Sequence, residues 1–230
     1  MPKGIFDKCV FESCIREYMS YKDGVYIEAG ANDGVKLSNT LFLEQEFNWS
    51  GLLVEPSHSA MIDCQKNRSS KNSFEECALV SDPNIKEIEG NFDGRLPACV
   101  SYVDDINPRL SDSAKDDPKI TVQASTLSNV LDKNDFPNVI DFLSLDVKGY
   151  ELEVLKGIDF KKYQFKYILT EVTYNFFGLK DVLEILEPAG MILSQTLNTI
   201  IPPSVLRADA KHRKIYLYRS NLLFFNMNLV

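Results

Sequence analysis

Near its N-terminal end the chain reads Val25-Tyr26-Ile27-Glu28-Ala29-Gly30-Ala31-Asn32-Asp33-Gly34. The apolar first half is typical of a short buried strand that ends at Gly30. Gly30 and Gly34 then allow a tight turn whose backbone can approach a ligand closely. A helical pattern resumes after Ser38. The stretch therefore predicts a strand, a ligand-binding turn and a helix, which together form the first unit of an α/β sheet.

A second strand is expected over Gly51-Leu52-Leu53-Val54-Glu55-Pro56, where the proline ends it. Glu55 lies 21 residues beyond Gly34. An acid at the end of the second strand, at this distance from a glycine turn, can accept the hydroxyl protons of a ribose. The turn and the acid together indicate a cofactor that contains a nucleoside.

The spacing and the charge of the turn favour one class of nucleoside. The glycines follow a G-x-x-x-G spacing with Asn32 in the middle, whereas the dinucleotide fingerprint is G-x-G-x-x-G. Glu28, just before the turn, would repel a pyrophosphate and attract an ammonium group. S-adenosylmethionine (SAM) carries an ammonium group, a sulfonium and no phosphate. We therefore expect SAM rather than NAD, which disfavours a dehydrogenase.

The rest of the chain continues the alternation of strands and helices. Further strands are expected over 74–80, 139–147, 167–172 and 191–197, with a β-rich terminal piece over 215–225. A β-α-β-α-β order predicts a parallel sheet with right-handed crossovers. We expect one domain over 1–230, with an N-terminal helix at about 5–20. Residues 81–121, rich in Asp, Pro, Ser and Asn, are expected to form an insertion or lid.

Composition narrows the class of partner. The 230 residues include 25 Lys and Arg against 33 Asp and Glu, which gives a formal net charge of −8. This balance argues against a nucleic-acid backbone or an anionic membrane as partner. The five cysteines form no C-x-x-C pair, so a structural zinc site or a disulfide framework is disfavoured. No apolar stretch reaches 18 residues and the start lacks a signal-peptide pattern. We expect a cytoplasmic protein without membrane insertion.

Several segments together resemble the FkbM-type SAM-dependent methyltransferase family, over about residues 24–175. The matching segments are 26–34, 38–44, 49–56, 125–127 and 142–157. The resemblance implies the class I methyltransferase (Rossmann-like) fold, an α/β fold with a mostly parallel seven-stranded sheet, one antiparallel terminal strand and helices on both faces. It also implies O-methylation of a hydroxyl on a sugar, a glycan or another small acceptor.

The cofactor residues are expected at the carboxyl edge of the sheet, where ligands bind in such folds. The resemblance also places the adenine ring at Ala78, within Cys77-Ala78-Leu79. The candidate cofactor-binding residues are Glu28, Gly30, Asn32, Asp33, Gly34, Glu55, Pro56, Ala78 and Asp146.

The candidate catalytic residues are Asp146, Lys148 and Glu171. A sugar hydroxyl is a poor nucleophile, so it needs a base or a metal to take or weaken its proton. Asp146 and Glu171 end two strands, and their carboxylates could share a divalent cation, Mg or Mn. Alternatively, Asp146 meets the cofactor or caps the next helix, and Glu171 only lines the pocket.

Lys148 stands where the family usually has the glutamate of an Asp-Val-Glu-Gly motif. It could act as a general base if its pKa were lowered by burial or a neighbouring cation, but a solvated lysine, or one paired with Glu151 or Glu171, is the better explanation. The change also supports an alternative function. In that alternative, the chain is a non-catalytic methyltransferase-fold interaction module that still binds the cofactor.

Overall fold

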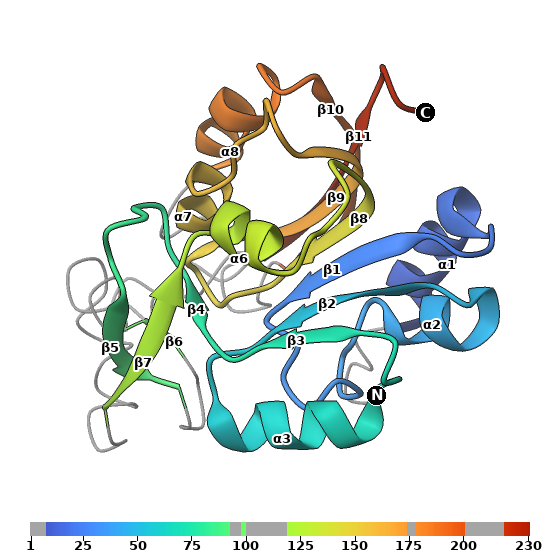
Figure 1. The fold of residues 1–230 in the computed structure, drawn as a ribbon. Coiled ribbons are helices and arrows are strands. Elements are labelled where there is room, and N and C mark those ends of the chain that lie inside the picture. Colours follow the sequence, from blue (N-terminus) through green and yellow to red (C-terminus); the bar gives the residue numbers. More distant parts are fainter. Residues whose placement is uncertain (1–7, 93–97, 100–118, 174–177, 201–218) are drawn as a thin grey trace, which may run out of the picture.

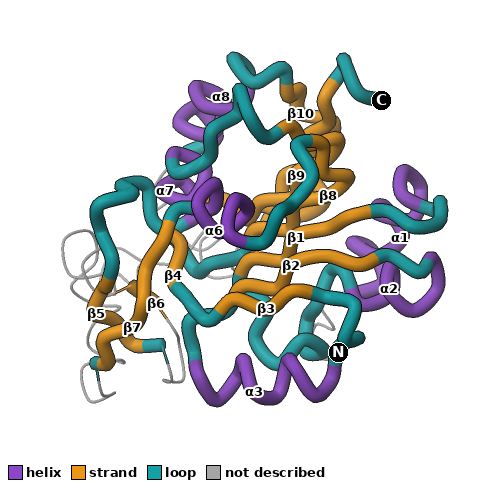
Figure 2. The backbone as a smooth tube through the Cα atoms, in the orientation of Figure 1, coloured by secondary structure: helices purple, strands orange, loops and turns teal. Residues whose placement is uncertain are grey.

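The computed structural model describes residues 8–92, 98–99, 119–173, 178–200 and 219–230. A seven-stranded sheet forms the centre of the molecule, in the order β10-β11-β9-β8-β1-β2-β3 (Figures 1 and 2). Its strands are β1 (Val25–Ala29), β2 (Ser50–Val54), β3 (Ser73–Glu75), β8 (Val139–Leu145), β9 (Gln164–Thr173), β10 (Met191–Ile200) and β11 (Arg219–Asn226). The first strands predicted from the sequence thus lie at the centre and at one edge of the sheet.

Strand direction confirms the predicted mostly parallel sheet. β2 and β8 flank β1 and run parallel to it, and β3 and β9 extend the parallel pairing outward. β11 alone runs antiparallel, inserted between β9 and β10. All the parallel strands therefore end at one edge of the sheet, where the turn after β1 also lies.

Helices cover both faces of the sheet (Figure 1). The helices are α1 (Lys8–Met19), α2 (Leu41–Phe47), α3 (His58–Asn67), α6 (Leu127–Lys133), α7 (Glu151–Lys156) and α8 (Leu179–Leu186). Two apolar clusters bury the two faces: one packs α1, α2 and α3 on the sheet, and the other packs α6, α7 and α8 on the opposite face. None of the described helices is long and apolar enough to cross a membrane.

Alternation along β1 assigns its side chains to these two faces. Tyr26 belongs to the cluster under α1–α3, whereas Ile27 and Ala29 belong to the cluster under α6–α8. Side chains on a strand point alternately to the two faces, so Glu28 shares the face of Tyr26. This placement decides the partners of Glu28 described below.

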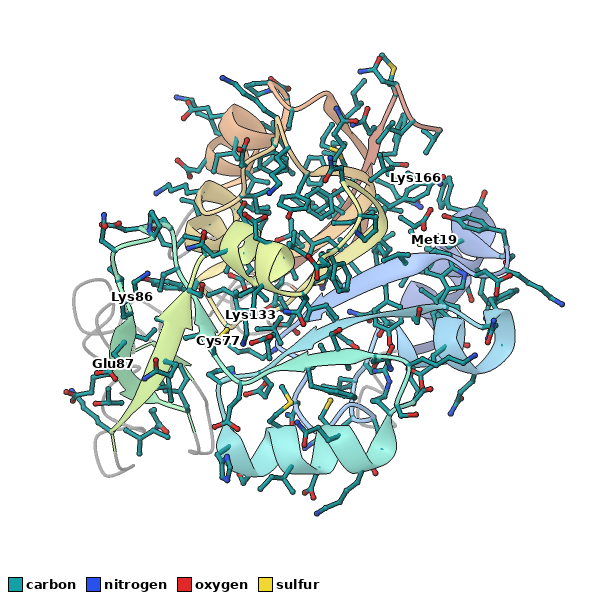
Figure 3. All side chains as sticks on the ribbon, in the orientation of Figure 1. Met19, Cys77, Lys86, Glu87, Lys133 and Lys166 are labelled. Carbon is teal, nitrogen blue, oxygen red and sulfur yellow. The ribbon has the colours of Figure 1, made fainter. Side chains whose placement is uncertain are left out.

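A second, four-stranded sheet has the order β4-β7-β5-β6 and lies beside the main one (Figure 2). It contains β4 (Ala78–Leu79), β5 (Glu87–Asn91), β6 (Ala98–Cys99) and β7 (Ile120–Ser125). The single strand predicted over 74–80 is wrong, because β3 ends at Glu75 and β4 pairs with β7 instead. Figure 3 labels Cys77 where the chain passes between the two sheets.

Two further segments predicted from the sequence are described only in part. The lid predicted over 81–121 lies in large part outside the described residues, and its described parts are 81–92, which include β5, then β6 and the first residues of β7. The start of the terminal piece predicted over 215–225 also lies outside them, and β11 covers the rest. Ser57 and Thr126 cap α3 and α6, because their hydroxyls accept from Ala60 N and Asn129 N.

Candidate cofactor and active site

A cavity that is partly open to solvent lies at the carboxyl ends of β1, β2 and β8. Seven of the residues singled out in the sequence line it: Gly30, Asn32, Glu55, Pro56, Ala78, Asp146 and Lys148. The structure therefore brings together most of the predicted cofactor residues and two of the three predicted catalytic residues. Glu28, Asp33, Gly34 and Glu171 are not among the lining residues.

Gly30 is required where the turn after β1 meets the end of β8. Its φ is +84°, and a Cβ at this position would lie 2.0 Å from the carbonyl oxygen of Asp146. The turn is also bound to β2, since Gly30 N and Ala31 N both donate to the carbonyl of Val54, at 3.0 and 3.1 Å. The close approach forms a cradle of backbone at the floor of the cavity that a larger residue would fill.

Glu55 presents a buried carboxylate to the cavity, with 7% of the residue exposed. Its Oε2 accepts from Asn32 N at 2.9 Å and its Oε1 accepts from Ser57 N at 3.0 Å. These two bonds fix the carboxylate between the turn after β1 and the start of α3. A fixed acid at the end of the second strand fits the two hydroxyls of a ribose.

The wall beyond Glu55 is apolar. Cys77, Ala78 and Leu79 form one part of it, and Ile88 and Phe92 from the small sheet form the rest. Burial raises the pKa of the Cys77 thiol to about 12, so this wall carries no thiolate at neutral pH. An apolar wall beside a fixed acid fits an adenine ring. Ile88 and Phe92 were not expected here, because no local pattern shows that β7 pairs with Ala78 and brings its neighbour β5 beside this wall.

Glu28 faces away from the cavity, as its position on β1 requires. Its carboxylate accepts from Ser38 Oγ at 2.8 Å, from Asn39 N at 2.9 Å and from Arg68 Nη1 at 3.1 Å. In this arrangement the charge of Glu28 is matched by Arg68 inside the protein, and its expected contact with a ligand ammonium stays a prediction.

Asp33 and Gly34 shape the turn instead of lining the cavity. Asp33 Oδ1 accepts from the amides of Val35 and Lys36, at 3.0 and 2.7 Å, and these bonds lower the pKa of the Asp33 carboxyl. Gly34 has a φ of +77°, and a Cβ there would lie 2.7 Å from Cγ of Arg68. Both residues thus act on the cofactor turn through its backbone conformation.

Three carboxylates meet where β8 and β9 end. One oxygen of each of Asp146, Glu151 and Glu171 lies within 4.8 Å of the others. Glu151 is completely buried and Glu171 is 6% exposed, whereas Asp146 is half-buried and reaches the cavity. Glu171 thus lies behind Asp146, and Glu151, which the sequence reasoning did not include in the site, lies beside both.

Glu151 holds the turn that carries Asp146 and Lys148. Its Oε1 accepts from Val147 N at 2.9 Å, and both of its oxygens accept from Gly149 N, at 3.1 and 3.0 Å. Burial, and then the neighbouring charge of Asp146, raise the pKa of Glu151 to about 8. A signal for it was present in the sequence, because an acid two residues after a glycine can bind the backbone of the turn before a helix.

Lys148 extends into the same cavity from a left-handed backbone conformation, with a φ of +58°. Its Nζ lies 2.6 Å from Asp146 Oδ1 and forms an ion pair with it. Both side chains are more than a third exposed, so the pair stabilises the fold weakly. Its effect is local: it fixes the orientation of the Asp146 carboxylate at the mouth of the cavity.

The sheet order, the cavity at the strand ends and the fixed acid at the end of β2 define a class I methyltransferase fold with a cofactor site. A comparison with known families agrees, because the family described as "Methyltransferase FkbM domain" matches residues 28–193. The chain therefore belongs to the FkbM family of SAM-dependent methyltransferases. No curated protein matches the chain.

Several solved structures are similar in backbone. The precorrin-6y C5,15-methyltransferase of Geobacter metallireducens has a TM-score of 0.49 and 10% identity, over 98% of this chain and 93% of that one. TrmK of M. capricolum, solved with S-adenosylhomocysteine, has a TM-score of 0.46 and 11% identity, over 94% of this chain and 67% of that one. The methyltransferase FkbM of Methylobacillus flagellatus KT has a TM-score of 0.45 and 13% identity, over 88% of this chain and 44% of that one.

Proposed function

We propose that this protein transfers a methyl group from SAM to a hydroxyl oxygen of a sugar, a glycan or another small acceptor. The observation that carries the proposal is the position of Asp146, which ends β8, lines the cofactor cavity and is backed by two buried carboxylates. When bound, SAM supplies an electrophilic methyl group on a sulfonium. The residues of this chain must then align the acceptor and take its proton.

Asp146 is the group placed to accept that proton. In the proposed reaction the acceptor oxygen forms a bond to the methyl carbon as the carbon–sulfur bond breaks, and the hydroxyl proton passes to the Asp146 carboxylate. Lys148 holds that carboxylate at 2.6 Å, and Glu151 holds the backbone on which both residues sit. The three side chains therefore divide the task into proton acceptance, orientation of the base and support of the turn.

A divalent cation was expected as an option at these carboxylates. Carboxylate oxygens are suitable ligands for Mg or Mn. In this arrangement, however, Glu151 already accepts from two backbone amides and Asp146 Oδ1 is paired with Lys148 Nζ. The cluster therefore fits a bound cation poorly, and we assign no step to a metal.

The charge of the protein supports a small acceptor. With a net charge of −8 the surface does not favour a phosphate backbone, so we infer no nucleic-acid partner. The five cysteines, which form no C-x-x-C pair, support our inference that the protein works in the cytoplasm. The alternative of a non-catalytic module is favoured by a single observation, which is that Lys148 already occupies one oxygen of the proposed base.

A panel assay tests the proposal. The protein is incubated with SAM and with free and nucleotide-linked sugars, and mass spectrometry looks for a gain of one methylene. We expect methylation of at least one sugar, a loss of turnover on the order of a hundredfold in Asp146→Asn, and no loss after removal of divalent cations with a chelator. Asp141→Asn provides the matched control, because Asp141 lies at the other end of β8 and binds Tyr21 and Lys166.

The outcomes separate the alternatives. Binding of SAM without transfer to any acceptor supports the non-catalytic module. Turnover that survives in Asp146→Asn contradicts the role of Asp146 as base. Turnover abolished by the chelator and restored by Mg or Mn shows that a metal takes part after all.

A further inference from the structure

Arg68 is a fully buried arginine directly after α3, outside the cavity and absent from the site predicted from the sequence. Its guanidinium is completely enclosed, with 0% of the side chain exposed. A charge in such a place is tolerated only when it is paired and its donors are satisfied. Arg68 meets both conditions, so its contacts show which parts of the molecule it holds together.

The guanidinium binds two carboxylates, three hydroxyls and one carbonyl. Nη1 donates to Glu28 Oε2 at 3.1 Å, to Ser38 Oγ at 3.2 Å and to the carbonyl of Gly34 at 3.0 Å. These partners are 30 to 40 residues away in sequence. Nη2 and Nε bind Tyr26, Thr40 and Glu44, at 2.7 to 2.9 Å.

These contacts fix the far side of the cofactor turn. Arg68 binds the carbonyl of Gly34, and its Cγ lies against the Cα of that glycine, where a Cβ would come within 2.7 Å. Asn67, the last residue of α3, donates to the carbonyl of Asp33 at 2.9 Å. The end of α3 therefore forms hydrogen bonds with two successive carbonyls of the turn. The opposite side of that turn faces the cavity.

Glu28 connects Arg68 to the segments at both ends of the turn. It belongs to β1, which leads into the turn, and it accepts from Asn39 N and from Thr40 Oγ1 in the segment that leads out of it. Without Arg68 the Glu28 carboxylate would be a buried charge with neutral partners only, among the residues described. Such a charge is strongly unfavourable, and the segments around it would have to open to admit water.

We propose that Arg68 is a positioning residue for SAM: it holds the Gly30–Gly34 turn in its binding conformation from behind, without contacting the cofactor. The proposal rests on the proposed cofactor only for its effect on affinity. Its structural part concerns the free protein, in which the turn should stay ordered only while the guanidinium bridges Glu28 and Gly34.

Hydrogen exchange in the ligand-free protein tests that structural part. In Arg68→Lys the compact ammonium cannot span Glu28, Glu44 and Gly34 together, so we expect faster exchange at the amides of Gly34 and Asn39. Glu44→Gln is the matched variant, because it weakens the other carboxylate partner of Arg68 but leaves the bonds to Gly34 and Glu28. In Glu44→Gln we expect faster exchange only near Ser69, whose amide donates to Glu44.

Calorimetric titration with S-adenosylhomocysteine gives the second readout. We expect Arg68→Lys and Glu28→Gln to bind about tenfold more weakly than wild type, which corresponds to about 1.4 kcal/mol. Glu44→Gln and the surface control Arg16→Lys, which alters a pairing with Glu12 and Glu46, should bind as wild type does.

Two results would overturn the proposal. One is unchanged exchange at Gly34 and Asn39 in Arg68→Lys, whatever the protein binds. The other is an equal loss of affinity in Glu28→Gln and Glu44→Gln when the melting temperatures of the two variants are lowered equally. That result would reflect general destabilisation of the fold. A wild-type protein that binds no methionine-derived nucleoside, with the exchange result as expected, would instead contradict the proposed cofactor and leave the support of the turn by Arg68 established.

Discussion

At the scale of single residues, backbone conformation matters as much as side-chain chemistry in this site. Gly30 has no side chain to offer, yet its Cα lies so close to the end of β8 that two strands can form one binding edge. Glu28, two residues earlier, is an acid in a cofactor motif that instead serves the interior of the protein. The residues around the turn therefore divide between those that face the ligand and those that shape its backbone.

Gly30→Ala should damage the site more than the fold. The new Cβ would lie 2.0 Å from a backbone oxygen at a φ of +84°, so the turn and the end of β8 must move apart. We expect a loss of cofactor binding on the order of a hundredfold together with a lower melting temperature, measured by calorimetry and by thermal unfolding.

Gly178→Ala is the control for this substitution. A Cβ at Gly178 would meet its nearest atom at 3.6 Å, and the φ of −110° suits any residue. Cofactor binding should remain as in wild type. Equal behaviour of the two variants would show that the approach of Gly30 to Asp146 is not needed for the site.

At the scale of elements, the turn before α7 depends on a buried acid. The pKa of Glu151 is raised from 4.5 to about 8, mainly by burial, so the folded protein holds this proton more tightly than the unfolded chain. The stability that this proton contributes is fully present below about pH 4.5 and is lost as pH rises through about 8.

The Glu151→Gln variant should lack this loss. Denaturant midpoints measured between pH 5 and pH 9 are expected to fall with pH in wild type more steeply than in the variant. Glu153→Gln on the same helix is the control, because Lys156 and Ser81 hold the pKa of Glu153 below its usual value. The pKa shift of Glu153 is therefore opposite in sign to that of Glu151. Parallel pH curves for wild type and Glu151→Gln would contradict the account of Glu151.

The elements also show what could be predicted from the sequence and why the rest could not. The turn after β1, the acid after β2 and the strand of Asp146 follow from local patterns, and the structure brings them to one cavity. The charge of Glu28 alone does not reveal that its side chain shares the face of Tyr26 and binds Arg68 in the interior. The division of 74–80 between two sheets and the bridge from Arg68 depend on partners far away in sequence, which no local pattern reveals.

At the scale of the whole molecule, the two sheets have different tasks. The main sheet, buried by helices on both faces, aligns the strand ends that carry Gly30, Glu55 and Asp146. The small sheet adds Ile88 and Phe92 to the apolar wall of the same cavity. Four of the acidic residues thus have two different positions. Glu55 and Asp146 face the cavity, while Glu28 and Glu151 support it from the interior.

Calorimetric titration of SAM, S-adenosylhomocysteine and NAD into wild type and Glu55→Ala tests the cofactor site most directly. We expect both methionine-derived nucleosides to bind and NAD to fail. Glu55→Ala should lose on the order of 2 kcal/mol of binding free energy, about thirtyfold in Kd. Glu76→Ala, which removes an exposed acid paired with His58, should bind as wild type does. Absence of binding by either nucleoside, or unchanged affinity in Glu55→Ala, would contradict the account.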